Sequence, residues 1–172
     1  FAVRGATDDL SALSEVLPAI ERAVRRILRE RELAGTIEQL RAHGARAGYQ
    51  TLDTLDADAV AAAVKAVYAE HGRLDGVVYG AGITEDQLIA NTDPESFQRV
   101  FNTKVSGARA LLDALASLPA PPRFTVLFGS IAAVAGNRGQ AAYAAANDAL
   151  ETLGARWAGN GLNAFTRARS ST

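Results

Sequence analysis

The chain has 172 residues, of which 48% are hydrophobic, and its formal net charge is −1. This length predicts one domain with a sizeable core, and the near-neutral charge argues against binding to nucleic acid or to a membrane surface. The sequence contains no cysteine, no apolar run long enough to span a bilayer and no visible secretory signal, which together favour a cytoplasmic protein without disulfides or thiolate metal sites.

The first 43 residues predict helix. Thr7-Asp8-Asp9 has the acceptors and negative charge of a helix start, and Pro18 predicts the first turn of a second helix that ends at His43-Gly44. Glutamates alternate with arginines along residues 21–38. This alternation favours a solvated, salt-bridged helix face over a nucleic-acid surface.

Next, the pattern alternates between strand and helix. Tyr49–Asp53 predicts a strand, residues 57–70 a helix and Gly76–Gly80 a buried strand. Asp56 is the expected N-cap of the helix. His71, like His43, falls at a predicted helix end, where a positive charge interacts favourably with the helix dipole. We therefore expect both histidines to be helix-end residues rather than metal ligands.

The segment after the Gly76–Gly80 strand carries small residues, Ala81 and Gly82, which let a ligand approach the backbone. Plain turn chemistry explains the same residues equally well. Asp93-Pro94 then predicts a strong helix start. On this helix Lys104 lies one position from the apolar face and is placed to point toward the strand ends.

The stretch from Ser130 to Asn147 organises the chain. A predicted strand ends at Ser130, and a glycine-containing loop leads into an alanine-rich helix with Tyr143 and Asn147 four residues apart on one face. In open α/β folds, ligands bind at the edge of the sheet formed by the C-terminal ends of the strands, where Ser130 is expected to lie. A tyrosine hydroxyl is a poor acid or base at neutral pH, but a cation such as Lys104 favours its phenolate. Taken singly each residue is ordinary; their combination predicts proton transfer to a carbonyl oxygen.

These motifs together resemble those of short-chain dehydrogenases/reductases, and within that superfamily the ketoreductase domains of polyketide synthases. The matching text is Asp75–Gly82, Asp93–Gly107 and Ser130–Asn147, within a resemblance over about residues 36–158. Most of the superfamily has lysine four residues after the tyrosine. Here that position is Asn147 and the lysine is Lys104, an exchange typical of ketoreductase domains in megasynthases.

The resemblance implies NADPH-dependent reduction of a β-ketoacyl thioester carried by an acyl carrier protein, with other synthase domains as partners. It implies that Tyr143 donates the proton, Ser130 binds the substrate carbonyl, Lys104 binds the nicotinamide ribose and favours the phenolate, and Asn147 orients the lysine and a relay water. The implied cofactor-binding residues are Asp53, Thr54, Gly80, Ala81, Gly82, Lys104 and Tyr143.

The implied fold is a Rossmann-like, three-layer α/β/α structure with a parallel sheet that lacks its first two strands. No Gly-x-Gly-x-x-Gly follows a strand before Thr36, and after a sixth-strand start at Gly161–Thr166 the text departs from the family at Arg167. We expect residues 1–43 to form a helical insertion or linker and residues 36–172 a partial ketoreductase domain. Because the first residue is Phe1 and methionine is absent, we expect a fragment or an excised domain.

Two questions stay open at the sequence level. A fragment without a phosphate loop is also consistent with an inactive ketoreductase that serves as a scaffold or interaction module through its 18–43 helix. Product stereochemistry is undefined as well, because residues 83–86 are Ile-Thr-Glu-Asp rather than a Leu-Asp-Asp motif, and Ala135 replaces the tryptophan of the other type.

Overall fold

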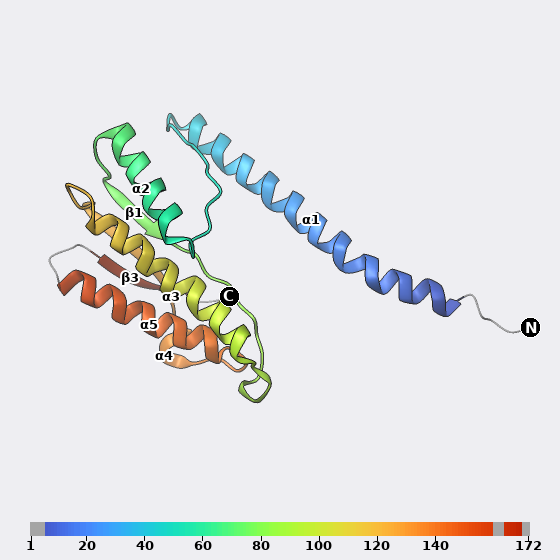
Figure 1. The fold of residues 1–172 in the computed structure, drawn as a ribbon. Coiled ribbons are helices and arrows are strands. Elements are labelled where there is room, and N and C mark those ends of the chain that lie inside the picture. Colours follow the sequence, from blue (N-terminus) through green and yellow to red (C-terminus); the bar gives the residue numbers. More distant parts are fainter. Residues whose placement is uncertain (1–5, 160–163, 170–172) are drawn as a thin grey trace, which may run out of the picture. The chain divides into compact units, whose positions relative to one another are not determined.

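The computed structural model describes the backbone of residues 6–159 and 164–169 and the side chains of residues 16–158. It divides into two compact units, Phe1–Thr51 and Leu52–Thr172. Figure 1 shows a long helix in the first unit and an α/β structure in the second. In the described part of the chain no helix is both long and apolar enough to cross a membrane.

The first unit is built on α1, a helix of 37 residues from Ala6 to Ala42. The predicted new helix at Pro18 is wrong, because the helix continues through this proline, although proline has no N–H to donate to the preceding turn. Arg25 pairs with Glu21 at 2.8 Å and Arg26 with Glu30 at 3.9 Å, which agrees with a solvated, charged face. The helix ends, as predicted, just before Gly44, whose φ is +84°.

The predicted strand at Tyr49–Asp53 does not form, because these residues have no regular secondary structure. Asp53 instead begins a turn in which its side chain accepts a hydrogen bond from the Leu55 amide at 2.9 Å. In the family's strand order, 3-2-1-4-5-6, strand 3 pairs with strand 2. This chain has no sequence for strand 2, so the segment has no ladder in which to satisfy its backbone groups.

The second unit contains a parallel sheet in the order β1-β2-β3, from Gly76–Tyr79, Phe124–Ser130 and Ala164–Arg169. The register places Tyr79 beside Leu127 and Ser130 beside Arg169. The expected strands 4, 5 and 6 of the family are therefore adjacent and parallel. The predicted sixth strand is β3, which extends to Arg169; residues 161–163 of that prediction lie outside the described residues.

The first two helices of this unit begin at the caps that the sequence predicts. Helix α2, Ala57–His71, has Asp56 as its N-cap, with a 2.9 Å bond from the Ala59 amide, and ends at left-handed Gly72. Helix α3, Pro94–Ala116, is capped by Asp93, which accepts from the Ser96 amide at 2.7 Å. Two further helices follow β2. They are the short α4, Ala132–Ala135, which the sequence did not indicate, and α5, Ala141–Gly159.

Two apolar clusters join these helices to the sheet. One contains Tyr79, Ala108, Leu112, Leu127 and Leu150, and the other Val60, Val64, Ala114 and Leu115. Trp157 packs against both clusters. Burying each of the large aliphatic side chains stabilises the fold by about 1.5–3 kcal/mol, so these clusters hold the helices against the sheet.

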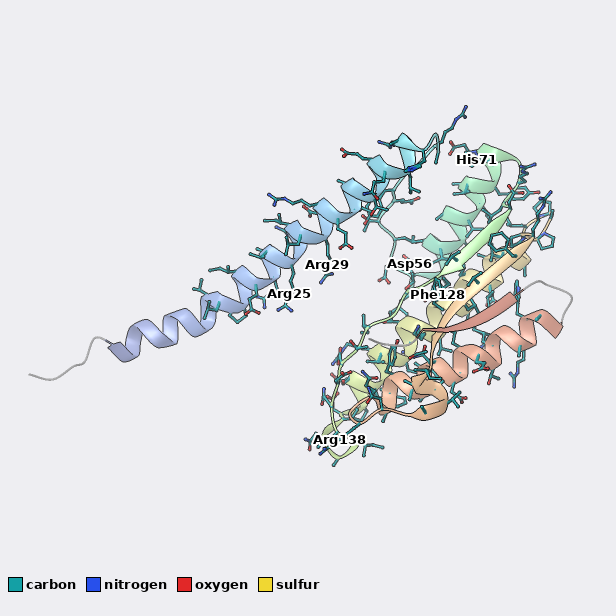
Figure 2. All side chains as sticks on the ribbon, turned by 180° about the vertical axis from the view of Figure 1, so that it is seen from behind. Arg25, Arg29, Asp56, His71, Phe128 and Arg138 are labelled. Atoms are coloured by element: carbon teal, nitrogen blue, oxygen red, sulfur yellow. The ribbon has the colours of Figure 1, made fainter. Side chains whose placement is uncertain are left out.

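Helices α2, α3 and α5 lie on one face of the sheet, as the two opposite views show (Figures 1 and 2). The side chains of the other face are less covered: Val78 is 58% exposed and Phe124 43%, and Phe128 is half-buried. Of the expected three layers, the described part of this unit thus contains the sheet and one helical layer. The C-terminal ends of β1 and β2, where the site residues lie, rest on that layer.

Candidate functional site

Ser130 is the last residue of β2 and only 4% exposed. Its hydroxyl oxygen accepts a hydrogen bond from the Ala132 amide at 3.2 Å, so the turn into α4 holds the side chain in place. Because β1 and β2 are parallel and in register, the serine lies at the same edge of the sheet as the Gly80–Gly82 segment. This is the edge at which ligands bind in open α/β folds.

Tyr143 and Asn147 lie one turn apart near the start of α5. The Asn147 side-chain amide donates to the backbone carbonyl of Tyr143 at 2.7 Å. Asn147 is 1% exposed, and its own carbonyl oxygen has no hydrogen-bond partner among the described residues. Buried acceptors normally have a donor, so Asn147 has an unsatisfied hydrogen-bond acceptor beside the tyrosine.

Lys104 comes from α3 and is 4% exposed. Its ammonium nitrogen donates to the Phe128 carbonyl at 2.9 Å and lies 5.8 Å from the centre of the Tyr143 ring. Burial lowers the pKa of Lys104 below its ordinary value, because removing the ammonium from water disfavours its charged form. The distance to the ring is within the range of a cation–π interaction.

The structure therefore brings Lys104, Tyr143 and Asn147 together through a close approach and a hydrogen bond. Ser130 is joined to this group through β2, since Lys104 binds the carbonyl two residues before it. Among the described residues no hydrogen bond joins the Ser130 hydroxyl directly to Tyr143. The serine, the tyrosine and the lysine come from a strand end and two different helices, so tertiary packing assembles the group.

The small residues after β1 lie against the same lysine. A Cβ on Gly82 would be 3.0 Å from Lys104 Cε and 3.3 Å from its Nζ. A Cβ on Gly80 would lie 3.5 Å from the Phe128 ring, and Ala81 packs on the core. A side chain at position 82 would displace the lysine. Packing against Lys104 therefore accounts for a glycine here, in addition to the approach of a ligand to the backbone.

Asp53 and Thr54 have different environments. Asp53 is exposed and holds the Leu55 amide with its own carboxylate. Thr54 lies beside Tyr79 and Gly107, where a Cβ on the glycine would be 3.0 Å from Thr54 Oγ1. Tyr79, whose pKa is raised by burial, donates to the Thr103 carbonyl at 2.7 Å. The structure thus places the 53–54 turn against α3, while Ser130 and the group of Lys104, Tyr143 and Asn147 lie at the strand ends.

Several residues of this region were not singled out by the sequence patterns. The Phe128 carbonyl that holds Lys104 is a backbone group, and no residue type signals it. Glu85 binds Arg99 and Ser96, and Asp86 binds Gln140. Glu85 and Asp86 are the acidic pair that follows the glycine segment, so their carboxylates were visible in the sequence but their partners were not.

The arrangement supports acid–base chemistry on a bound carbonyl compound. It has a hydroxyl donor in Tyr143, a buried cation beside it and a second hydroxyl in Ser130. Within residues 16–158, whose side chains are described, no group of three or more His, Asp or Glu side chains is placed to hold a metal ion. The groups that this site offers are therefore side-chain proton donors and a cation.

The fold and this site define a protein of the short-chain dehydrogenase/reductase type. A solved short-chain dehydrogenase from Mycobacterium avium superposes with a TM-score of 0.73 at 25% identity, covering 80% of this chain and 53% of that one. A solved ketoreductase from the first module of phoslactomycin biosynthesis in Streptomyces sp. HK803 gives 0.73 at 34% identity, over 78% of this chain and 30% of that one.

The KR-domain family model matches residues 20–168, so this chain belongs to the ketoreductase domain family of polyketide and fatty-acid synthases. It is 36% identical over 146 residues to a polyunsaturated fatty acid synthase polypeptide of Thraustochytrium sp., covering 84% of this chain and 5% of that protein. It is 37% identical over 131 residues to pikromycin polyketide synthase component PikAII of Streptomyces venezuelae, covering 76% and 4%. The chain thus corresponds to a small part of large multidomain synthases.

Proposed function

We propose that the complete domain to which this chain contributes reduces a β-ketoacyl thioester to a β-hydroxyacyl thioester with NADPH. The observation that carries the proposal is the approach of the buried Lys104 ammonium to the Tyr143 ring at 5.8 Å, with Asn147 bonded to the tyrosine backbone. Taking an ammonium out of water costs free energy, so the burial of Lys104 beside Tyr143 at the end of a parallel sheet requires a functional reason. Ketone reduction supplies one.

In this proposal Tyr143 is the general acid that gives its hydroxyl proton to the ketone oxygen. The Ser130 hydroxyl donates a second hydrogen bond to that oxygen, which holds the carbonyl in reach and stabilises the charge that develops on it. To donate, the serine keeps its bond from the Ala132 amide, which uses a lone pair and leaves the O–H free. Lys104 favours the phenolate that remains after the transfer.

Asn147 is proposed to orient Lys104 and a relay water through which a proton returns to the tyrosine. Its unpartnered carbonyl oxygen is buried next to Tyr143, so it is suited to hold a water molecule or the lysine ammonium. The bond that its amide makes to the Tyr143 carbonyl prevents the side chain from turning away. A proton that enters through the relay restores the hydroxyl for the next turnover.

The residues present fit the nicotinamide ribose and the adenine of NADPH, but not the pyrophosphate between them. Lys104 beside Gly82 offers a cation and an open backbone for the nicotinamide ribose, and the 53–54 turn offers a carboxylate for the adenine. When bound, NADPH supplies the hydride for the carbonyl carbon. The pyrophosphate has no site in this sequence, because a glycine-rich turn that leads into a helix N-terminus is missing. We therefore propose that residues outside this sequence complete the cofactor site.

The test is reduction of a β-ketoacyl thioester by the synthase polypeptide that contains this chain. The loss of NADPH absorbance measures the rate. We expect turnover that Tyr143→Phe abolishes and Tyr49→Phe leaves unchanged, because Tyr49 is 62% exposed and lies in the first unit. Equal rates for the two variants would reject the assignment. The acyl carrier protein and other synthase domains are the proposed partners, in the cytoplasm.

A second proposed function is that of an inactive ketoreductase that serves as an interaction module. The observation in its favour is α1, on which the large apolar side chains at positions 16, 17, 20, 24, 27 and 28 are all exposed. We propose, as the domain organisation, a helical segment at 1–43 and a partial ketoreductase at 36–172. Absence of ketoreduction in the unmodified synthase, together with loss of a partner domain on Ile20→Glu, would favour this function.

A further inference from the structure

The loop after β1 carries an acidic side chain with an unusually complete set of partners. Glu85 accepts two bonds from Arg99, at 3.0 Å from Nε and 2.8 Å from Nη2. It also accepts from the Ser96 hydroxyl at 2.6 Å, and Ser96 is 1% exposed. Ser96 and Arg99 both belong to the first turns of α3, so Glu85 ties the loop to the N-terminal end of that helix.

The next two residues tie the same loop to α5. Asp86 accepts from the Gln140 side-chain amide at 3.1 Å. The Gln87 amide donates to the Gly139 carbonyl at 2.8 Å, in a parallel bridge of Gln87 with Gln140. Gln140 in turn starts the helix, because its own carbonyl accepts from the Ala144 amide at 2.8 Å. Tyr143 lies in that first turn.

We propose that Glu85, Asp86 and Gln87, which we call the loop clamp, are positioning residues that hold Lys104 and Tyr143 at their working separation. The loop clamp joins the N-terminal ends of the two helices that carry these side chains. It is continuous across both, since Gln87 also donates to the Ser96 hydroxyl oxygen at 3.3 Å. It acts through the helices and touches neither Lys104 nor Tyr143 by any hydrogen bond in the described structure.

The mechanism is the stiffness of a helix over a few turns. Arg99 precedes Lys104 by five residues on α3, and Gln140 precedes Tyr143 by three, so each tie lies within about 8 Å along the helix axis of the residue it positions. A shift of either helix start is therefore passed to the lysine or tyrosine with little loss. Misplacement of reacting groups by about 1 Å is enough to cost on the order of 100-fold in rate.

The first measurement uses the chain itself and needs no cofactor. Lys65 and Lys104 are its two lysines, so ¹³C-labelled lysine gives two resolved side-chain signals whose titration NMR follows directly. Burial lowers the pKa of Lys104, and Lys65 is exposed on α2. If Glu85→Gln and Asp86→Ala loosen the helices, water reaches Lys104 and its pKa rises toward the ordinary value.

Arg73→Ala is the matched control, since it removes another ion pair of the same unit, the 3.1 Å pair with Asp75, before β1 begins. We expect it to leave the titration of Lys104 unchanged. Far-UV circular dichroism shows that each variant is folded; for a clamp variant that is not, the double exchange Glu85→Arg with Arg99→Glu restores the pair. An unchanged Lys104 titration in a folded Glu85→Gln, Asp86→Ala chain overturns the proposal, as does failure of the double exchange to fold.

The consequence for catalysis rests on the proposed function and is measured separately, in the synthase polypeptide. There we expect the clamp variants to lower kcat about 10- to 100-fold with little change in KM, because the substrate contacts at Ser130 are intact. If the clamp variants change the Lys104 titration but the unmodified synthase shows no ketoreduction, the proposed function is refuted. The positioning role of the loop clamp is then still supported. Normal kcat with a shifted titration would refute its role in catalysis.

Discussion

The side-chain amide of Asn147 donates to the backbone carbonyl of Tyr143 at 2.7 Å, while its carbonyl oxygen is buried without a partner among the described residues. In most of the superfamily a lysine occupies this position. Here the cation reaches the tyrosine from α3 instead, with Lys104 Nζ 5.8 Å from the ring centre. The exchange of lysine and asparagine predicted from the sequence thus corresponds to two neighbours of one tyrosine.

The first prediction concerns the proton donor. Tyr143→Phe in the synthase polypeptide should lower ketoreduction by about 10²- to 10⁴-fold, the range that a positioned general acid contributes. The melting temperature should stay within a few degrees, because the lost hydroxyl makes no hydrogen bond in the described structure. Steady-state rates and a thermal melt of the same preparation measure both. A large loss of stability with the loss of rate would reveal a structural role instead.

The second prediction concerns the cation. Lys104→Ala should move the alkaline limb of the pH–rate profile to higher pH, because it removes the positive charge that lies 5.8 Å from the centre of the Tyr143 ring. Lys65→Ala, the control, alters the other lysine of the chain, on exposed α2 surface. A limb that stays in place for Lys104→Ala would show that the lysine does not influence the reacting proton.

The third prediction is a pH dependence of stability. The hydrogen bonds from Arg99, followed by the one from Ser96, lower the pKa of Glu85 from 4.5 to about 2. A carboxyl group with a lowered folded-state pKa stabilises the fold above its unfolded-state value, and this contribution disappears as the pH falls from about 4.5 to 2. Urea unfolding of the wild type and Glu85→Gln should therefore converge over that range. A difference that persists to pH 2 would contradict the assignment.

The fourth prediction compares two glycines. Gly107→Ala would place a Cβ against Tyr79 Oη and 3.1 Å from Thr54 Cβ, so we expect a loss of about 1–3 kcal/mol, as for other overpacked sites. Gly35→Ala has nothing within 4 Å of the new Cβ and lies inside α1, where alanine should gain up to about 1 kcal/mol in helix stability. Denaturant melts for Gly107→Ala and helicity by circular dichroism for Gly35→Ala measure these effects. A Gly107→Ala chain as stable as the wild type would contradict the close packing of this glycine against Tyr79 and Thr54.

The fifth prediction concerns the 172-residue chain expressed alone. It should bind NADPH weakly or not at all, because the pyrophosphate lacks its backbone amides and β1 has no partner strand on its outer side in the described sheet. Such an open strand edge also favours aggregation. Titration calorimetry and light scattering test both points. Micromolar affinity with a cooperative melt would show that the chain forms a dinucleotide site by another route.

Local chemistry was enough to define most elements of this chain. Asp56, Asp93 with Pro94, and Gly72 begin and end their helices as predicted, because caps act within one turn. The strand that ends at Ser130 and the tyrosine–asparagine spacing on the next helix follow from short-range pattern as well. Two local predictions were wrong: Pro18 lies inside one continuous helix, and Tyr49–Asp53 is not a strand.

Long-range partners account for what the pattern did not contain. A strand needs a neighbouring strand to satisfy its backbone hydrogen bonds. Without strand 2 the Tyr49–Asp53 segment has no such neighbour, whereas β1, β2 and β3 pair in one sheet. The environment of Lys104 is likewise tertiary: its partner is a backbone carbonyl on β2, and helix packing removes its ammonium from water. The residue types of the site could be read along the chain, but their distances, and the clamp from Glu85 to Arg99, depend on how α3 and α5 pack on the sheet.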